Sequence, residues 1–120
     1  MKLSRSAFKP RKQNAPRPAE KSAPGFLQWL RGRECAAVHF GACEGKIEAA
    51  HTYGAGDKGI GTKNSDQFAI PLCSRHHRIQ HDRGWRTFEN EHGLALPAPD
   101  MAKIYWRNWP GRKSWEAKQQ

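Results

Sequence analysis

Three cysteines and one histidine constrain this 120-residue chain more than any other feature of its sequence. Two residues separate Cys73 from His76, and this spacing lets a tight turn aim both side chains at one ion. Seven residues separate Cys35 from Cys43, which provide a second pair upstream. Together they make a Cys3His set, which is typical of a closed tetrahedral structural zinc site. The alternative is three buried, inert thiols, and the spacing favours the zinc.

The composition makes such a metal site useful to the fold. Hydrophobic residues are 37% of the chain and the mean hydropathy is -0.92, so the core is thin and a bound metal would offset the shortage. The net charge of +10 points to a polyanionic partner, with nucleic acid as the first choice over a merely soluble basic protein. An odd cysteine count without a secretory leader predicts a reducing cytoplasm, and no apolar run has the length of a membrane span.

The N-terminal segment, residues 1–24, is predicted to be a disordered basic arm. It carries seven Lys or Arg residues against one acid and is interrupted by four prolines. Such a segment cannot bury enough apolar surface to fold alone. Its cations, Arg11 and Lys12 among them, would bind nucleic-acid phosphates by counterion release, although a tail that only aids solubility is the alternative. Residues 25–120 are predicted to form the folded domain.

The rest of the chain predicts an α+β domain of short elements. Apolar spacing predicts helices over residues 26–30 and 97–109, and a helix over residues 75–83 that Gly84 ends. Residues 34–40 are expected to be extended. Residues 46–53 and 66–72 are predicted strands, the first carrying His51 and the second ended by Pro71. The tail over residues 110–120 is expected to fray unless Trp115 docks.

Two further patterns indicate chemistry. His77 and His81 are four residues apart, so a helix would stack both imidazoles on one face, where they can chelate a second ion. The alternatives are a solvated pair, or one of them replacing His76 at the zinc. The loop over residues 54–63 contains four glycines together with Lys58 and Lys63. Glycine lets a backbone approach a phosphate closely, so we expect this loop to face DNA rather than to be a plain connector.

These motifs occur in a characteristic order. The cysteine pair is followed by AAH ending at His51, by GIGTKNSD ending at Asp66, and by PLCSRHHRIQH ending at His81. In this order the chain resembles the HNH endonucleases of the ββα-metal group, also called His-Me finger nucleases. The similarity is to phage and prophage members, including recombination-associated nucleases, and it covers residues 32–92. It implies a small zinc-stabilised ββα-metal domain with flanking helices.

The resemblance also implies roles for individual residues. His51 takes the position of the general base, and His77 with His81 would hold a catalytic Mg²⁺ or Mn²⁺. Asp66 lies near the position whose residue braces the loop that presents the base. Many family members have a metal-binding His or Asp immediately before the base, whereas this chain has Ala50. The ion would then depend on the two histidines with water and phosphate, or recruit another side chain such as Asp66.

Three functions are therefore open. The leading one is a metal-dependent HNH endonuclease that hydrolyses DNA phosphodiester bonds in the cytoplasm of a bacterial host. Arg75 and Arg78 on the predicted metal-bearing helix would add DNA contacts, and the resemblance suggests a recombination protein as a further partner. The alternative is a non-catalytic, zinc-stabilised nucleic-acid-binding module, in which Ala50 has abolished the activity. A structural or assembly protein with a basic tail comes third.

Overall fold

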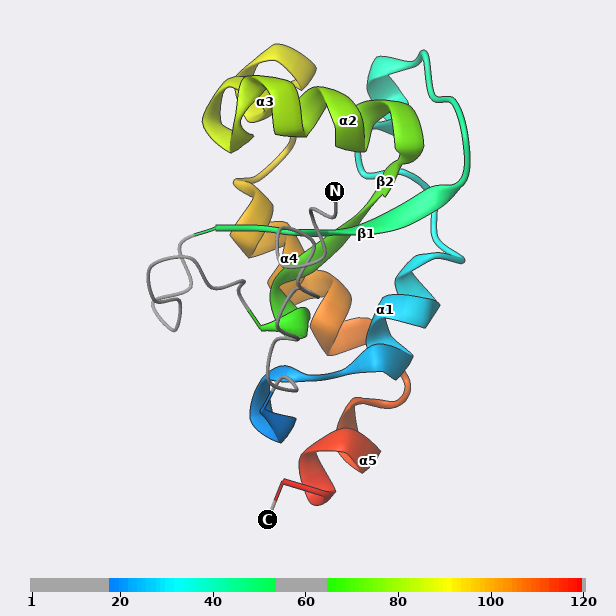
Figure 1. The fold of residues 1–120 in the computed structure, drawn as a ribbon, viewed down its shortest axis with the longest axis vertical. Coiled ribbons are helices and arrows are strands. Elements are labelled where there is room, and N and C mark those ends of the chain that lie inside the picture. The colour runs from blue at the N-terminus through cyan, green and yellow to red at the C-terminus, as the bar shows by residue number, and fades with distance from the viewer. Residues whose placement is uncertain (1–17, 54–64, 120) are drawn as a thin grey trace, which may run out of the picture.

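Two antiparallel strands lie at the centre of the fold, β1 (Ile47–His51) and β2 (Ala69–Cys73). Figure 1 shows them in the computed structural model of the chain, which describes residues 18–53 and 65–119. The register pairs Ile47 with Cys73 and His51 with Ala69. The hairpin therefore holds Cys73 at one end and His51 at the other.

Figure 1 shows α2 and α3 on one side of this hairpin and α1 on the other. The helix α4 contacts both groups, because Ala98 and Ala102 pack in the cluster of Phe88 and Trp106 contacts Phe26. The bounds of the helices are α1 (Pro24–Leu30), α2 (Ser74–Arg83), α3 (Trp85–His92), α4 (Ala98–Asn108) and α5 (Arg112–Ala117). Three short 3-10 helices complete the described elements: η2 (Ala19–Lys21), η3 (Val38–Phe40) and η4 (Asp66–Phe68). The result is a small α+β domain, as the sequence predicts.

The helix α2 follows β2 without a linker and has a clear signal at each end. The Cys73 sulfur accepts a hydrogen bond from the backbone amide of His76 at its start. At its end Gly84 has a φ of 85°, which favours glycine, and donates its backbone N–H to the carbonyl of Gln80 at 2.8 Å. Ending α2 there lets the chain turn directly into α3.

The predicted helices are confirmed, with small changes in their bounds, but other local predictions are wrong. Residues 34–40 are not extended throughout, because Val38–Phe40 form η3. The second strand begins at Ala69, because Asp66–Phe68 form η4. Pro71 does not end the ladder either. It pairs with Ala49 inside β2, where its missing N–H is tolerated because the sheet has only two strands.

The core divides into two clusters, one on each side of β1. Ala50 belongs to the cluster that contains Phe88 of α3, whereas Ala49 packs against the cluster that contains Phe26 and Leu30 of α1. Successive residues of a strand point to opposite faces, so this division gives the direction of the side chains next to Ala49 and Ala50. Glu48 shares the face of Ala50, and His51 shares the face of Ala49.

The C-terminal region does not fray in the part of the chain that the structure describes. Trp106 contacts Phe26 of α1 with ring centroids 5.0 Å apart, and Trp115 of α5 contacts Trp106 at 5.1 Å. The indole N–H of Trp115 also donates to the carbonyl of Ser22 at 2.7 Å. Trp115 therefore docks against Trp106 and Ser22, which confirms the alternative prediction.

The predicted disordered arm does not extend to residue 24. Ala19–Lys21 form η2, Ala23 is buried, and Pro24 is already the first residue of α1. The remainder of the predicted arm, with Arg11 and Lys12, lies outside the described residues, as do Lys58 and Lys63 of the glycine-rich loop. Among the helices over residues 18–53 and 65–119, none has the length and apolarity that a membrane span requires.

Candidate metal centre and candidate catalytic residues

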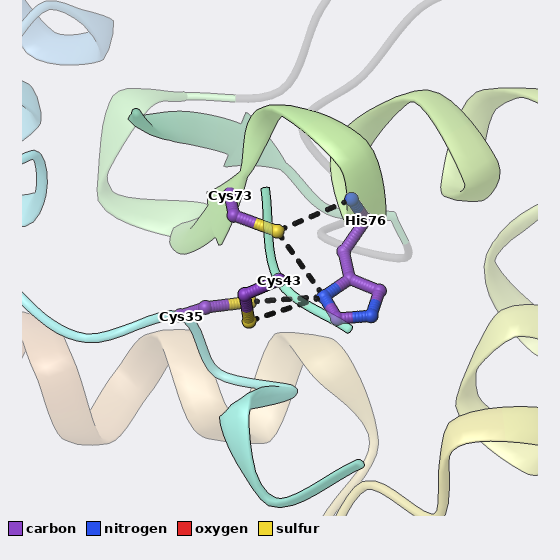
Figure 2. A group of neighbouring side chains, drawn as sticks. All are labelled: Cys35, Cys43, Cys73 and His76. Carbon is purple, nitrogen blue, oxygen red and sulfur yellow. Dashed lines mark hydrogen bonds between the residues drawn. The ribbon is translucent and has the colours of Figure 1, made fainter. Parts of the chain in front are cut away.

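The four predicted zinc ligands meet at the junction of β2 and α2. Cys35, Cys43, Cys73 and His76 each offer one ligand atom, and these atoms lie within 4.8 Å of one another. Figure 2 shows the three sulfur atoms grouped around Nδ1 of His76, at 3.4, 3.6 and 3.2 Å in chain order. A tetrahedral zinc with ordinary bond lengths requires sulfur-to-nitrogen separations of about 3.5 Å. This group could therefore hold a metal ion such as zinc.

The chemistry of the donors fits such an ion. Burial raises the pKa of the Cys35 thiol to about 12, and burial also raises the pKa of Cys43. At Cys73 burial acts in the same direction, but hydrogen bonds from backbone amides and from the thiols of Cys43 and Cys35 together outweigh it and lower the pKa. Burial lowers the pKa of His76, which keeps the imidazole in its neutral, metal-binding form. A divalent cation would offset the cost of thiolates in this buried setting.

Aromatic rings pack around His76. The ring of His92 lies 5.2 Å from it and that of Phe88 lies 6.2 Å from it. Nε2 of His76 is buried and has no hydrogen-bond partner among the described residues, which leaves Nδ1 as the nitrogen directed at the sulfurs. His39, which lies between Cys35 and Cys43 in the sequence, is on the surface and outside this group, and its Nε2 donates to the carbonyl of His92 at 2.8 Å.

A second group lies at the far end of the hairpin, where His51 meets Asp66. Nε2 of His51 is 2.9 Å from Oδ1 of Asp66, whose side chain is only 6% exposed. The other carboxylate oxygen accepts the backbone N–H of Ala23 at 2.8 Å, which fixes the carboxylate. Asp66 is thus directed at His51 and at the start of α1. The pairing of these two predicted site residues leaves Nδ1 of His51 as the nitrogen that can take a proton.

A third group lies on α2, on the opposite face of β1. The rings of His77 and His81 are 4.8 Å apart, as the spacing of four residues predicts. Nδ1 of His77 is 2.7 Å from Oε1 of Glu48, and Oε2 of the same carboxylate accepts the Ser74 hydroxyl at 2.9 Å. The carboxylate beside the paired histidines is therefore Glu48, whereas Asp66 lies with His51.

Glu48 was not among the predicted site residues, although the sequence contains a signal for it. Glu48 is two residues before Ala50, so both side chains point to the face of β1 that α2 covers. An alternation of this kind within a predicted strand would have placed a carboxylate near the helix. The hydrogen bonds from His77 and Ser74 lower the pKa of Glu48, so the carboxylate stays ionised near neutral pH.

The end of β1 lies beside the junction of α2 and α3. The indole N–H of Trp85 donates to the backbone carbonyl of His51 at 3.1 Å. Trp85 follows His81 by four residues, so the last turn of α2 lies near the strand end that carries His51. Of the predicted DNA contacts on α2, Arg78 is exposed and Arg75 is half-buried.

Comparison with known proteins identifies relatives without a described activity. A family described as "Protein of unknown function (DUF968)" matches residues 11–101. The "Uncharacterized protein YdfU" of Escherichia coli (strain K12) is 32% identical over 71 residues, which is 59% of this chain and 19% of that protein. The chain thus spans about a fifth of the length of this relative. No solved structure matches the chain.

Proposed function

This chain belongs to the DUF968 family of proteins of unknown function, and from that premise we propose that it is a metal-dependent DNA endonuclease of the HNH type. The reaction would be hydrolysis of phosphodiester bonds, at a ββα site that a structural zinc stabilises. The observation that carries this proposal is the pair formed by His51 and the buried carboxylate of Asp66 at the end of β1. A histidine held in this way suits a general base.

The order of elements supports the ββα assignment. The strands β1 and β2 form a hairpin, and α2 follows directly and carries His77 and His81. The Cys3His group lies where β2 joins α2, so a zinc there would fix the angle between hairpin and helix. The bound zinc would therefore act on the fold and take no part in the chemistry.

The role of His51 follows from its hydrogen bond. When Nε2–H donates to Asp66, the lone pair is on Nδ1, which can take a proton from an attacking water molecule. The Asp66 carboxylate would also stabilise the imidazolium that this transfer produces. Since Ala23 and His51 share the carboxylate, the imidazole cannot rotate without breaking a contact of a buried group.

The histidine pair on α2 would hold the divalent ion. An Mg²⁺ or Mn²⁺ bound there would supply positive charge to the scissile phosphate and to the leaving oxygen. Trp85 at the start of α3 donates to the backbone carbonyl of His51, so the strand end that carries the base lies beside the junction of α2 and α3, although the imidazole of His51 and the histidine pair lie on opposite faces of β1. The net charge of +10, with Arg75 and Arg78 on the same helix, supports DNA as the polyanion.

Ala50 favours a second candidate, a zinc-stabilised nucleic-acid-binding module without activity. Its side chain is a buried methyl group on the face that α2 covers, and it cannot bind a metal. The two candidates share the zinc and the DNA and differ in whether the protein hydrolyses the DNA that it binds. An assay for cleavage therefore separates them.

We expect the purified, zinc-loaded protein to cut supercoiled plasmid when Mg²⁺ or Mn²⁺ is added, and His77→Ala to need more of the ion. Because the substitution removes a ligand and leaves the base in place, the Mn²⁺ concentration for half-maximal cleavage should rise at least about tenfold. Gel analysis of plasmid conversion over a Mn²⁺ titration measures this. His39→Ala, which removes an exposed imidazole elsewhere, should match the wild type. Absence of cleavage by the wild type at every ion concentration would support the binding module instead.

The basic arm can be tested by removing residues 1–17, which leaves Ala23 and its bond to Asp66 in place. These residues contain six Lys or Arg and no acid, so the truncation removes the same net charge as removal of residues 1–24. DNA affinity should fall, and the slope of log K against log salt should become shallower by about 0.9 for each phosphate that the arm neutralises in the full chain. Fluorescence anisotropy at several salt concentrations measures both. A salt slope equal to that of the full chain would show that the arm does not bind phosphates.

A further inference from the structure

The carboxylate of Glu48 has two partners, both on α2. Its Oε1 is 2.7 Å from Nδ1 of His77, and its Oε2 accepts the hydroxyl of Ser74. The backbone N–H of Ser74 donates to the carbonyl of Lys46 at 2.9 Å, so the start of α2 is joined to the start of β1. Glu48 is thereby held in one orientation towards His77, although its side chain is 39% exposed.

This orientation selects one form of the His77 ring. A neutral imidazole carries its proton on one nitrogen and its lone pair on the other, and the hydrogen bond at one nitrogen decides which is which. A carboxylate only accepts, so Nδ1 of His77 must carry the proton and donate it to Glu48. The lone pair is then on Nε2, the nitrogen farther from Glu48. Metal-binding histidines characteristically donate their other N–H to a carboxylate in this way.

The geometry points to Glu48 as the positioning residue of a divalent-cation site on α2, in which His77 binds the ion through Nε2 and His81 supplies the second imidazole. Glu48 acts through His77: it fixes the tautomer and makes the ring a stronger donor. The inference rests on the ion site of the proposed function and adds the residue that prepares it. It also explains how an ion site can form although Ala50 offers no ligand. Glu48 of the same strand contributes a carboxylate, which bonds to His77 on the ring nitrogen that does not bind the ion.

A purely structural role for Glu48 is the competing explanation, because the contact with Ser74 also joins α2 to β1. The two roles differ in what they act on. If the role of Glu48 is structural, its removal changes folding stability, and the tautomer of His77 has no effect on cation affinity. A positioning role changes the tautomer and the cation affinity together, and requires His77 for its effect.

The test uses the full zinc-loaded chain and Mn²⁺ as the probe. Long-range ¹H–¹⁵N spectra of the histidine rings should show the Nδ1–H tautomer at His77 in the wild type and its loss in Glu48→Ala. Mn²⁺ affinity, measured by the electron paramagnetic resonance signal of the free ion, should fall about 10- to 100-fold in Glu48→Ala. Glu48→Gln keeps an acceptor oxygen and the side-chain length, so its Mn²⁺ affinity should fall less. This variant keeps the test valid if Glu48→Ala fails to fold.

Two controls decide the interpretation. Asp82→Asn removes the same charge from an exposed position of α2 and should leave Mn²⁺ affinity within about twofold of the wild type, because adjacent helix residues do not face each other. In the His77→Ala background, Glu48→Ala should cause no further loss, since coupled residues are not additive. A full additional loss there, or an unchanged tautomer in Glu48→Ala, would overturn the inference. Mn²⁺ binding that depends on Glu48 without any DNA cleavage would support the inference and contradict only the endonuclease.

Discussion

Stripping the Cys3His centre of its metal is expected to unfold the protein. The four ligands come from three separate segments: Cys35 follows α1, Cys43 precedes β1, and Cys73 and His76 lie where β2 meets α2. Binding of zinc to such small sites contributes about 10–16 kcal/mol, whereas a whole domain is stable by about 5–15 kcal/mol. The thin core cannot replace a contribution of that size. Circular dichroism melts before and after chelation should show the cooperative transition disappear.

Elemental analysis completes the experiment, with about one zinc expected per chain before chelation. Cys73→Ser should behave like the chelated protein even in excess zinc, because it removes a buried ligand. His39→Ala is the matched control, since it removes a potential ligand that lies on the surface, and it should keep both zinc and the melting transition. A metal-free wild type with an unchanged cooperative melt would contradict the structural role of the centre.

Cleavage of DNA is expected to fall by about a hundredfold or more in His51→Ala, the usual scale for loss of a general base. The imidazole is 22% exposed and contacts Asp66, so its removal should leave the core clusters intact. Zinc content, the melting transition and DNA affinity should therefore stay close to those of the wild type. Plasmid conversion at saturating Mn²⁺ measures the loss, and added ion should not restore the rate. In this respect His51→Ala must differ from His77→Ala.

Asp66→Asn provides a graded companion to this variant. The amide keeps the size of the side chain and an oxygen for Ala23, but it removes the negative charge that stabilises the imidazolium. Its rate should lie between those of the wild type and His51→Ala. Cleavage by a contaminating nuclease would be the same in both variants and the wild type. Cleavage by His51→Ala at the wild-type rate would therefore rule out His51 as the base.

The Cys3His cluster and α2 were predictable because their signals are local. A spacing of two residues between Cys73 and His76, the spacing of four between His77 and His81, and Gly84 after the last turn each describe neighbours in sequence. The contact between His51 and Asp66 was anticipated only as a brace. The distance of 2.9 Å depends on how the hairpin closes, which local patterns do not specify.

Other features depend on tertiary contacts and were missed. The α3 segment has only Trp85 and Phe88 as large apolar residues, so its helical pattern is weak in the sequence, and the helix depends on packing of Phe88 into the core. Glu48 was overlooked because its role arises from the face of β1 that it shares with Ala50. The proline within β2 was misjudged because a two-stranded sheet has no second neighbour to require its N–H.

The tryptophan contacts of the C-terminal region extend the folding unit beyond the family match, which ends at residue 101. Phe26 belongs to the matched part, yet Trp106 and Trp109 cover it, and Trp115 reaches the carbonyl of Ser22. Ser22 is followed by Ala23, whose backbone N–H donates to the Asp66 carboxylate beside His51. Recombinant versions of this protein that end at residue 101 would therefore expose an aromatic surface and loosen that carboxylate from a distance, so domain boundaries for expression are better placed after Trp115.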